Sequence, residues 1–199
     1  MRKKLSKTAV FFLAFLVLVV AGFFASKFKS AAEVPPAFEQ ARMDGAVTAQ
    51  DIVNLSNQLV TDLNEVNRMD SQGNTREALS LTVGLLQKSN DVRGLAVKLS
   101  DQLGKMTTAL SGVKSTDARA AALESISDRL ALINKLINYS DELAQLAEVL
   151  QHKFIGTYDA RKVPALVSQI NGEVTAINNF NRLAGAAMDK FDQIIKGAN

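Results

Sequence analysis

The chain of 199 residues contains no cysteine, no tryptophan, one histidine and three prolines. Without cysteine it forms no disulfide, zinc–thiolate site, thiol nucleophile or lipoprotein anchor. A di-iron bundle site normally needs two Glu-x-x-His motifs, and His152 stands alone. A Ser-His-Asp triad would also depend on His152, and no nucleophile elbow lies near it. These absences argue against an enzyme, and the sequence predicts no cofactor and no metal site.

The charges are unevenly distributed along the chain. The formal net charge is +3, but residues 1–30 hold six Lys or Arg side chains and no acidic one. The rest of the chain therefore holds 17 basic and 20 acidic side chains and is mildly acidic. A mixed, slightly negative surface is not typical of a nucleic-acid-binding protein, so we expect no nucleic-acid partner.

The longest apolar run, which holds no charge, extends from Ala9 to Ala25. With Thr8 and Ser26 it is just long enough to cross the apolar core of a bilayer as one helix. We therefore predict that residues 1–30 form a cytoplasmic tip and a transmembrane signal anchor, with the lipid bilayer as the first partner. The residues that we place in the membrane are Ala9, Phe12, Leu16, Val20 and Phe24.

The orientation follows from the basic residues on either side of this run. Four basic side chains and the amino terminus precede it, and Lys27 and Lys29 follow it. The positive-inside rule then places the N-terminus in the cytoplasm and the body of the chain outside. A signal peptide cleaved near Ala32 is the alternative, and it would make the body a secreted protein. The length of the run and the two following lysines favour retention in the cell membrane.

A short linker separates the membrane segment from the body. Pro35 and Pro36 stop any helix that continues straight out of the membrane, so we assign residues 31–36 to this linker. Residues 37–199 show helical periodicity and no strand alternation, and we assign them to one helical bundle domain. The fold class is therefore all-α.

The first helical segment is expected from about Ala37 to Met69. We expect a break near Asp44-Gly45 and a helix N-cap at Asp51. The second segment begins near Asn74, and its apolar residues recur every seven positions, as in a coiled coil. This seam consists of Leu85, Val92, Leu99, Met106 and Val113.

The third segment follows a turn that is capped by Ser115 or Thr116, and it stops at Gly156. We assign Leu123 and Leu130 to its apolar stripe, together with Ile126, Ile133, Ile137, Leu143, Leu146, Leu150 and Phe154.

The fourth segment has Pro164 in its first turn, which suits a helix start. Its stripe repeats every seven residues and is wide enough for a bundle core. Similar lengths and short turns favour a long antiparallel four-helix bundle. In this bundle the turn at residues 111–117 would lie near the lipid. The stripe consists of Ile170, Ile177, Ala184 and Phe191.

Taken together, these patterns predict a membrane-anchored envelope protein. Its extracytoplasmic bundle would mediate protein–protein interaction as a scaffold, adaptor or accessory subunit. The sequence is also compatible with a homo-oligomer. The alternative is a sensory bundle that binds a small ligand between its helices. Tyr158, in the turn after Gly156, is the candidate for an exposed contact with a partner that the sequence does not identify.

Overall fold

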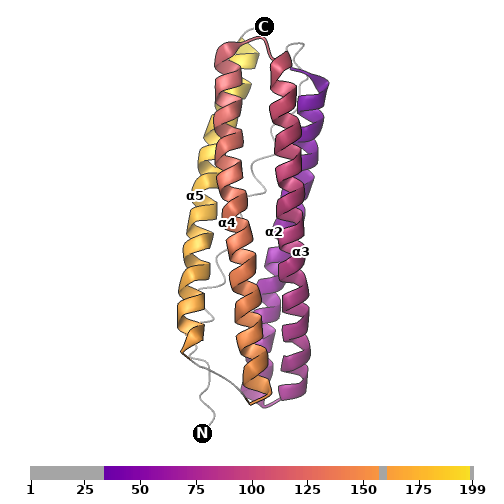
Figure 1. Ribbon diagram of the computed structural model, residues 1–199, viewed down its shortest axis with the longest axis vertical. Coiled ribbons are helices and arrows are strands. Elements are labelled where there is room, and N and C mark those ends of the chain that lie inside the picture. The colour runs from indigo at the N-terminus through magenta and orange to yellow at the C-terminus, as the bar shows by residue number, and fades with distance from the viewer. Residues whose placement is uncertain (1–33, 157–160, 198–199) are drawn as a thin grey trace. The chain divides into compact units, whose positions relative to one another are not determined.

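The computed structural model describes residues 34–156 and 161–197, and every regular element in these ranges is helical (Figure 1). This confirms the all-α fold class and the helical bundle. Four long helices follow one another, and a short 3-10 helix, η3 (Leu110–Gly112), extends the second of them. The long helices are α2 (Pro36–Gln72), α3 (Thr75–Ala109), α4 (Thr116–Phe154) and α5 (Lys162–Gly197).

The turns between the helices contain glycine and a capping serine, and Gly156 and Ser115 stand where the sequence indicated. Gly73 and Gly156 both adopt a positive φ, of 80° and 93°, which favours glycine because it lacks a Cβ. The backbone N–H of Ala118 donates to Ser115 Oγ at 3.2 Å, so Ser115 caps α4 as expected. The helix ends are thus determined locally.

Two local expectations for the first helix are wrong. Helix α2 continues through Asp44 and Gly45 without a break, and Asp51 lies inside it rather than at an N-cap. Gly45 lies against α3, and a Cβ built on it would meet Leu99 Cδ1 at 3.5 Å. Packing between the helices therefore outweighs the low helix propensity of this glycine.

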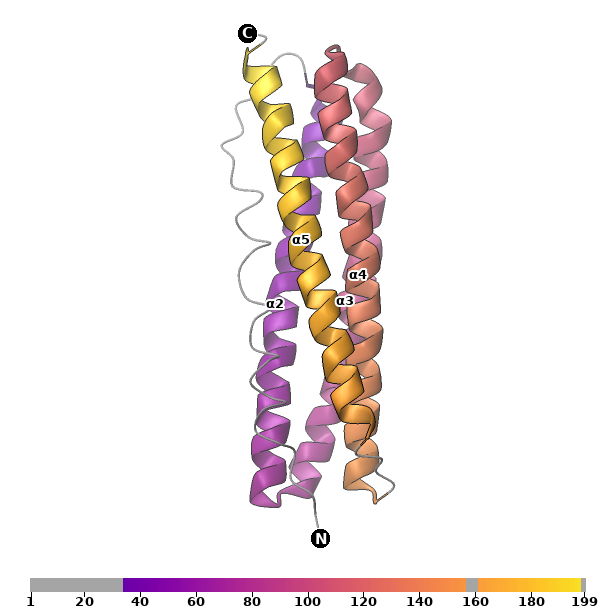
Figure 2. The ribbon, with the colours of Figure 1, turned by 90° about the vertical axis from the view of Figure 1, so that its left-hand side faces the viewer.

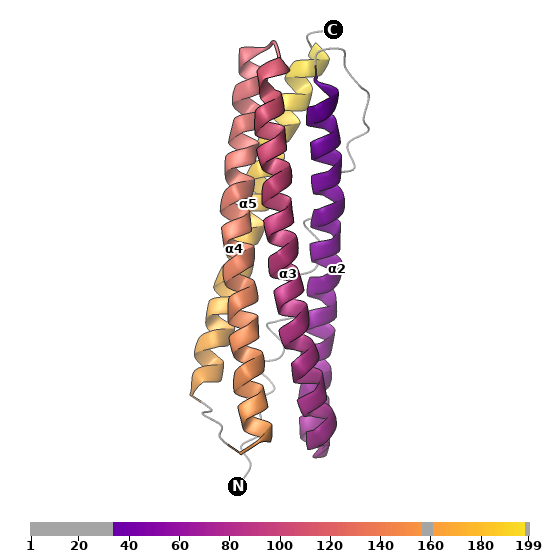
Figure 3. The same ribbon diagram turned by 45° about the vertical axis from the view of Figure 1, so that its right-hand side comes forward.

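The chain divides into two compact units, and each long helix contributes to both. Unit 1 contains Val53–Gly94 and Leu136–Thr175. Unit 2 contains residues 34–52, Leu95–Lys135 and residues 176–197. Within each unit four helical segments lie side by side, and consecutive segments are antiparallel (Figures 1, 2 and 3).

In unit 1 the core is built from the predicted seams, and ion pairs join its helices. Lys88 of α3 pairs with Asp62 of α2 at 2.6 Å, and Lys153 of α4 pairs with Asp70 of α2. Both pairs are partly buried and fix which helix faces meet, and burial of the apolar seams stabilises the unit. The buried apolar residues include Leu59, Val66, Leu85, Val92, Leu143, Leu146 and Ile170.

In unit 2 the core combines apolar side chains with many small residues. Phe38 of α2 and Phe191 of α5 are almost fully buried, with ring centroids 5.2 Å apart. Ser125 of α4 donates to the carbonyl oxygen of Ala184 of α5 at 2.8 Å. Small residues allow the helices to approach closely. The other buried apolar residues include Ala96, Leu99, Leu103, Met106, Ala121, Ala122, Ile126 and Met188.

None of the helices in residues 34–156 and 161–197 is both long enough and apolar enough to cross a membrane. The run from Ala9 to Ala25 lies outside these ranges. The transmembrane helix therefore stays a prediction from the sequence.

Candidate functional site

The residues that the sequence singled out for function lie outside the described part of the chain. Tyr158 falls in the gap between Gly156 and Arg161. The expected membrane residues precede the first described residue, and they are Ala9, Phe12, Leu16, Val20 and Phe24. The candidate site is therefore built from unit 2, where the predicted linker joins the helices.

The start of α2 is packed firmly onto the turn between α3 and α4. Val34 is buried, and a Cβ built on Gly112 would lie 2.6 Å from Pro35 Cγ. Only glycine leaves room for the proline ring at this place. Because Phe38 is also buried against Phe191, the residues after the predicted linker have a fixed position in unit 2. We call this contact of Val34, Pro35, Phe38, Gly112 and Phe191 the α2 junction.

A buried ion pair lies one turn further along α2. Arg42 is 4% exposed and donates two hydrogen bonds of 2.8 Å to the two carboxylate oxygens of Asp192 on α5. Burial alone would lower the pKa of Arg42, but the hydrogen bonds and charge of Asp192 outweigh it, so this pKa is raised. Glu39 lies 3.9 Å from the guanidinium, and burial raises the pKa of its carboxyl group. The pair joins the first and last helices.

A second arginine is buried in unit 2. Arg129 of α4 is 5% exposed; burial lowers its pKa to about 9, and the positive charge of Arg42 adds to this shift. It is still charged at neutral pH. No group of three or more His, Asp or Glu side chains in the described ranges is placed to hold a metal ion.

The surface of unit 2 differs from the sequence-based expectation on α4. We placed Leu123 and Leu130 in the buried stripe, but they are 49% and 42% exposed. Val97 of α3 is 52% exposed as well. Large apolar side chains exposed together on one face of a protein often mark an interaction site. We call Val97, Leu123 and Leu130 the α3/α4 strip.

Helical geometry places Val97 on the side of α3 that faces away from α2, and it places Leu123 and Leu130 on the side of α4 that faces away from α5. A Cβ on Gly45 of α2 would lie 3.7 Å from Gln102, so that side of α3 faces α2. Val97 lies about 140° around the helix from Gln102, at 3.6 residues per turn.

The corresponding argument holds for α4. Ser125 bonds to α5, so its side of α4 faces α5. Leu123 and Leu130 lie about 140–160° around the helix from Ser125. Helices α3 and α4 lie side by side in Figures 1 and 3, so the strip lies on the sides of these two helices that face away from α2 and α5.

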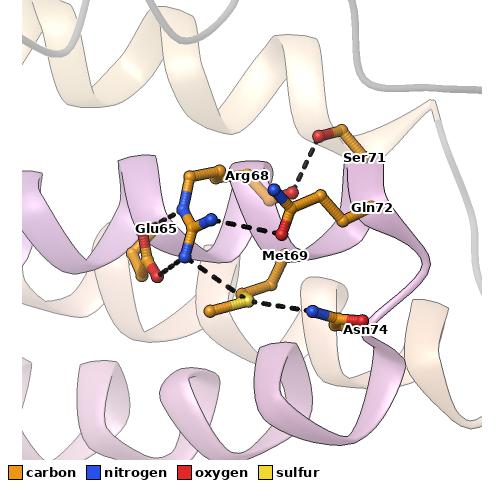
Figure 4. A network of polar contacts seen from close by, with 6 residues as sticks. All are labelled: Glu65, Arg68, Met69, Ser71, Gln72 and Asn74. Atoms are coloured by element: carbon orange, nitrogen blue, oxygen red, sulfur yellow. Dashed lines mark hydrogen bonds and ion pairs between the residues drawn. The ribbon is translucent and has the colours of Figure 1, made fainter.

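The turn between α2 and α3, in unit 1, carries an exposed polar network (Figure 4). Arg68 donates to both carboxylate oxygens of Glu65, at 2.7 and 2.5 Å, and to Gln72 Oε1 at 3.2 Å. Ser71 Oγ donates to the backbone carbonyl of Arg68 at 2.7 Å, and the Asn74 amide lies 3.6 Å from Met69 Sδ. All these contacts join residues close in sequence, so the network stabilises the C-terminal end of α2 and the turn that follows it.

Unit 1 buries two hydroxyl groups that have no hydrogen-bond partner among the described residues, Tyr139 Oη and Ser56 Oγ. Ser56 lies 14 residues before Asp70 on α2, and Tyr139 lies 14 residues before Lys153 on α4. Because Asp70 and Lys153 form an ion pair and the two helices run parallel, Ser56 and Tyr139 lie at the same height along unit 1. Burial raises the pKa of Tyr139. A buried polar group without a partner costs about 1–3 kcal/mol.

We therefore expect Tyr139→Phe to leave the stability of the protein unchanged or to raise it by about 1 kcal/mol. Tyr139→Ala, which also removes the buried ring, should cost about 3–5 kcal/mol. Urea unfolding followed by circular dichroism measures both. A loss above about 1 kcal/mol for Tyr139→Phe would mean that the hydroxyl has a partner, such as a bound water.

No protein-family model matches the chain, and no curated protein or solved structure is similar enough to count as a match. The class of protein is therefore defined by the fold of the described residues: four long helices with a packed apolar core, a buried ion pair between α2 and α5 and an exposed apolar strip.

Proposed function

We propose that the chain is a single-pass, membrane-anchored envelope protein whose extracytoplasmic helices mediate protein–protein interaction as a scaffold, adaptor or accessory subunit. The N-terminus lies in the cytoplasm and the helical body outside. The proposal assigns the chain no catalytic activity.

The α3/α4 strip is the observation that carries the interaction role. Burying an apolar side chain lowers the free energy by about 25 cal/mol per Å², so the exposed Val97, Leu123 and Leu130 favour a protein partner. The strip lies in unit 2, which also holds the α2 junction.

The membrane anchor is supported by the uncharged run from Ala9 to Ala25 and by the basic residues on both sides of it. The α2 junction adds a structural argument. A tether that ended in a flexible hinge would leave the body free to turn, whereas the packing of Pro35 on Gly112 holds the start of α2 against the α3–α4 turn. This turn would then face the lipid.

The test is protease accessibility of the body in intact and in permeabilised cells, combined with N-terminal sequencing of the recovered protein. We expect cleavage from outside in intact cells, with Met1 or Arg2 still present in the protein before digestion. A mature chain that starts at Glu33 would instead show a secreted protein. Cleavage only after permeabilisation would show that the body faces the cytoplasm and would refute the orientation.

A small-ligand site between the helices is the second candidate, and one observation favours it. Tyr139 Oη and Ser56 Oγ are buried at the same level of unit 1 without a hydrogen-bond partner among the described residues. A small polar molecule could satisfy both. The Tyr139→Phe variant separates the two candidates, because a bound ligand that uses the hydroxyl would make this substitution destabilising.

A further inference from the structure

Two buried hydroxyl groups of unit 1 point toward each other across its core. Ser56 and Tyr139 each lie 14 residues before a member of the Asp70–Lys153 ion pair, and 14 residues are four helical turns less about 40°. Because the side chains of Asp70 and Lys153 meet, those of Ser56 and Tyr139 also face one another, four turns further along the unit. Ser56 is fully buried and Tyr139 is 1% exposed, yet neither hydroxyl has a hydrogen-bond partner among the described residues. Their desolvation is therefore not compensated within these ranges.

A glycine of α3 lies at the same height. Gly94 stands six residues after Lys88, and Ser56 stands six residues before Asp62, the ion-pair partner of Lys88 on the antiparallel helix α2. A Cβ built on Gly94 would meet nothing within 4 Å, so packing does not require a glycine here. This glycine lowers the helix propensity of α3 without a gain in contacts. We call Ser56, Gly94 and Tyr139 the Tyr139 layer.

The next layer of unit 1 is apolar. Leu63 and Leu146 stand seven residues after Ser56 and Tyr139 on the same two helices, and both are buried. Burial of two leucines removes apolar area from water and leaves no hydrogen bond unmade. Neighbouring layers on the same helices therefore differ sharply in the free energy that holds them closed.

The Tyr139 layer also lies at the end of its unit. On the described helices, unit 1 begins at Val53 of α2 and Leu136 of α4 and ends at Gly94 of α3, so each member of the layer is within three residues of such a boundary. A layer at the end of a compact unit has contacts within that unit on one side only. Its opening therefore breaks fewer of the contacts inside unit 1 than the opening of a central layer would.

We propose that unit 1 has a built-in opening point: the Tyr139 layer opens locally, admits water to the two hydroxyl groups and closes again while the rest of the unit stays folded. The open form recovers hydrogen bonds for both hydroxyls, and Gly94 makes the unwinding of α3 easier at this height. The inference does not depend on the proposed function, because it holds whether or not the chain is anchored in a membrane.

Native-state hydrogen exchange of the full-length chain in mild detergent, read by mass spectrometry of short peptides, tests the proposal. Amides beside Ser56, Gly94 and Tyr139 should have protection factors on the order of tenfold lower than amides beside Leu63 and Leu146. Equal protection of the two layers, or stronger protection of the Tyr139 layer, would overturn the proposal.

Single substitutions show whether the hydroxyl groups and the glycine cause the opening. Ser56→Ala removes one buried hydroxyl and should raise the protection of the layer by about tenfold, and Gly94→Ala should raise it by about fivefold. Ser89→Ala is the matched control, because Ser89 is a buried serine of unit 1 whose hydroxyl donates to the carbonyl oxygen of Leu85 at 2.8 Å. It should not raise the protection of the layer.

The serine pair gives a sharp decision. Both substitutions change helix propensity by the same amount, so only the loss of an unsatisfied hydroxyl distinguishes Ser56→Ala from Ser89→Ala. If Ser56→Ala gives no more protection than Ser89→Ala, the hydroxyl groups do not drive the opening and the proposal is wrong. Lower protection in Ser56→Ala would show that a bound molecule satisfies the hydroxyls in the closed unit, and this would also overturn it.

Discussion

Replacing Asp192 by alanine is expected to lower the free energy of unfolding by about 3 kcal/mol. The substitution removes both short hydrogen bonds of Arg42, which is 4% exposed, and Glu39 lies 3.9 Å away, too far to replace them. Arg42 stays buried but loses two charge-assisted hydrogen bonds that offset the cost of its desolvation. Urea unfolding of the full-length chain in mild detergent, followed by circular dichroism, measures the loss.

Two further variants show whether the lower free energy of unfolding comes from the buried guanidinium of Arg42 after it loses its hydrogen bonds to Asp192. Arg42→Met combined with Asp192→Leu removes both charges and should recover most of the stability, since a buried ion pair often contributes little more than an apolar pair of similar size. In the exposed pair of Arg68 with Glu65, Glu65→Gln should have no measurable effect. If Asp192→Ala proves as harmless as Glu65→Gln, the pair does not hold α2 to α5.

Replacing Phe38 by alanine is expected to cost about 3–5 kcal/mol, the range for a buried aromatic ring. Phe38 is fully buried against Phe191, at 5.2 Å between ring centroids, and the cavity would lie at the α2 junction. The same unfolding experiment measures this loss. Because the junction holds the start of α2, we also expect faster proteolysis near Pro35 in the native state.

Phe154→Ala is the matched control, since Phe154 is only half-buried at the end of α4 in unit 1. It should cost less, about 1–2 kcal/mol, and should leave cleavage near Pro35 unchanged. Equal proteolysis in both variants would contradict a specific role of Phe38 at the junction.

The helices were largely predictable because their signals are local. The seven-residue seam from Leu85 to Val113 is buried at every position, as is the stripe from Ile170 to Phe191. Gly73 and Gly156 adopt the positive φ that a helix stop needs, and Ser115 caps α4. Each of these features depends on residues within one or two turns, so the sequence contains the information directly.

The side of α4 that faces inward was not predictable in the same way. Leu123 and Leu130 fit an apolar stripe, yet the buried side of α4 carries Ser125 and Arg129. A periodic pattern gives the spacing of buried residues, but the neighbouring helices decide the direction in which they point. Here the inward side of α4 carries Ser125, which donates to Ala184, together with Ile126 and Ile133, and both leucines lie at the surface.

By itself the sequence determined the helical class, the helix ends and most of the apolar core, and it predicts the membrane run. Only the tertiary structure decided that Arg42 is buried, because its partner Asp192 lies 150 residues away in the chain. It also decided that Gly112 makes room for Pro35 and that the α3/α4 strip is exposed. Each of these depends on contacts between distant segments, and such contacts leave no periodic signal in the sequence.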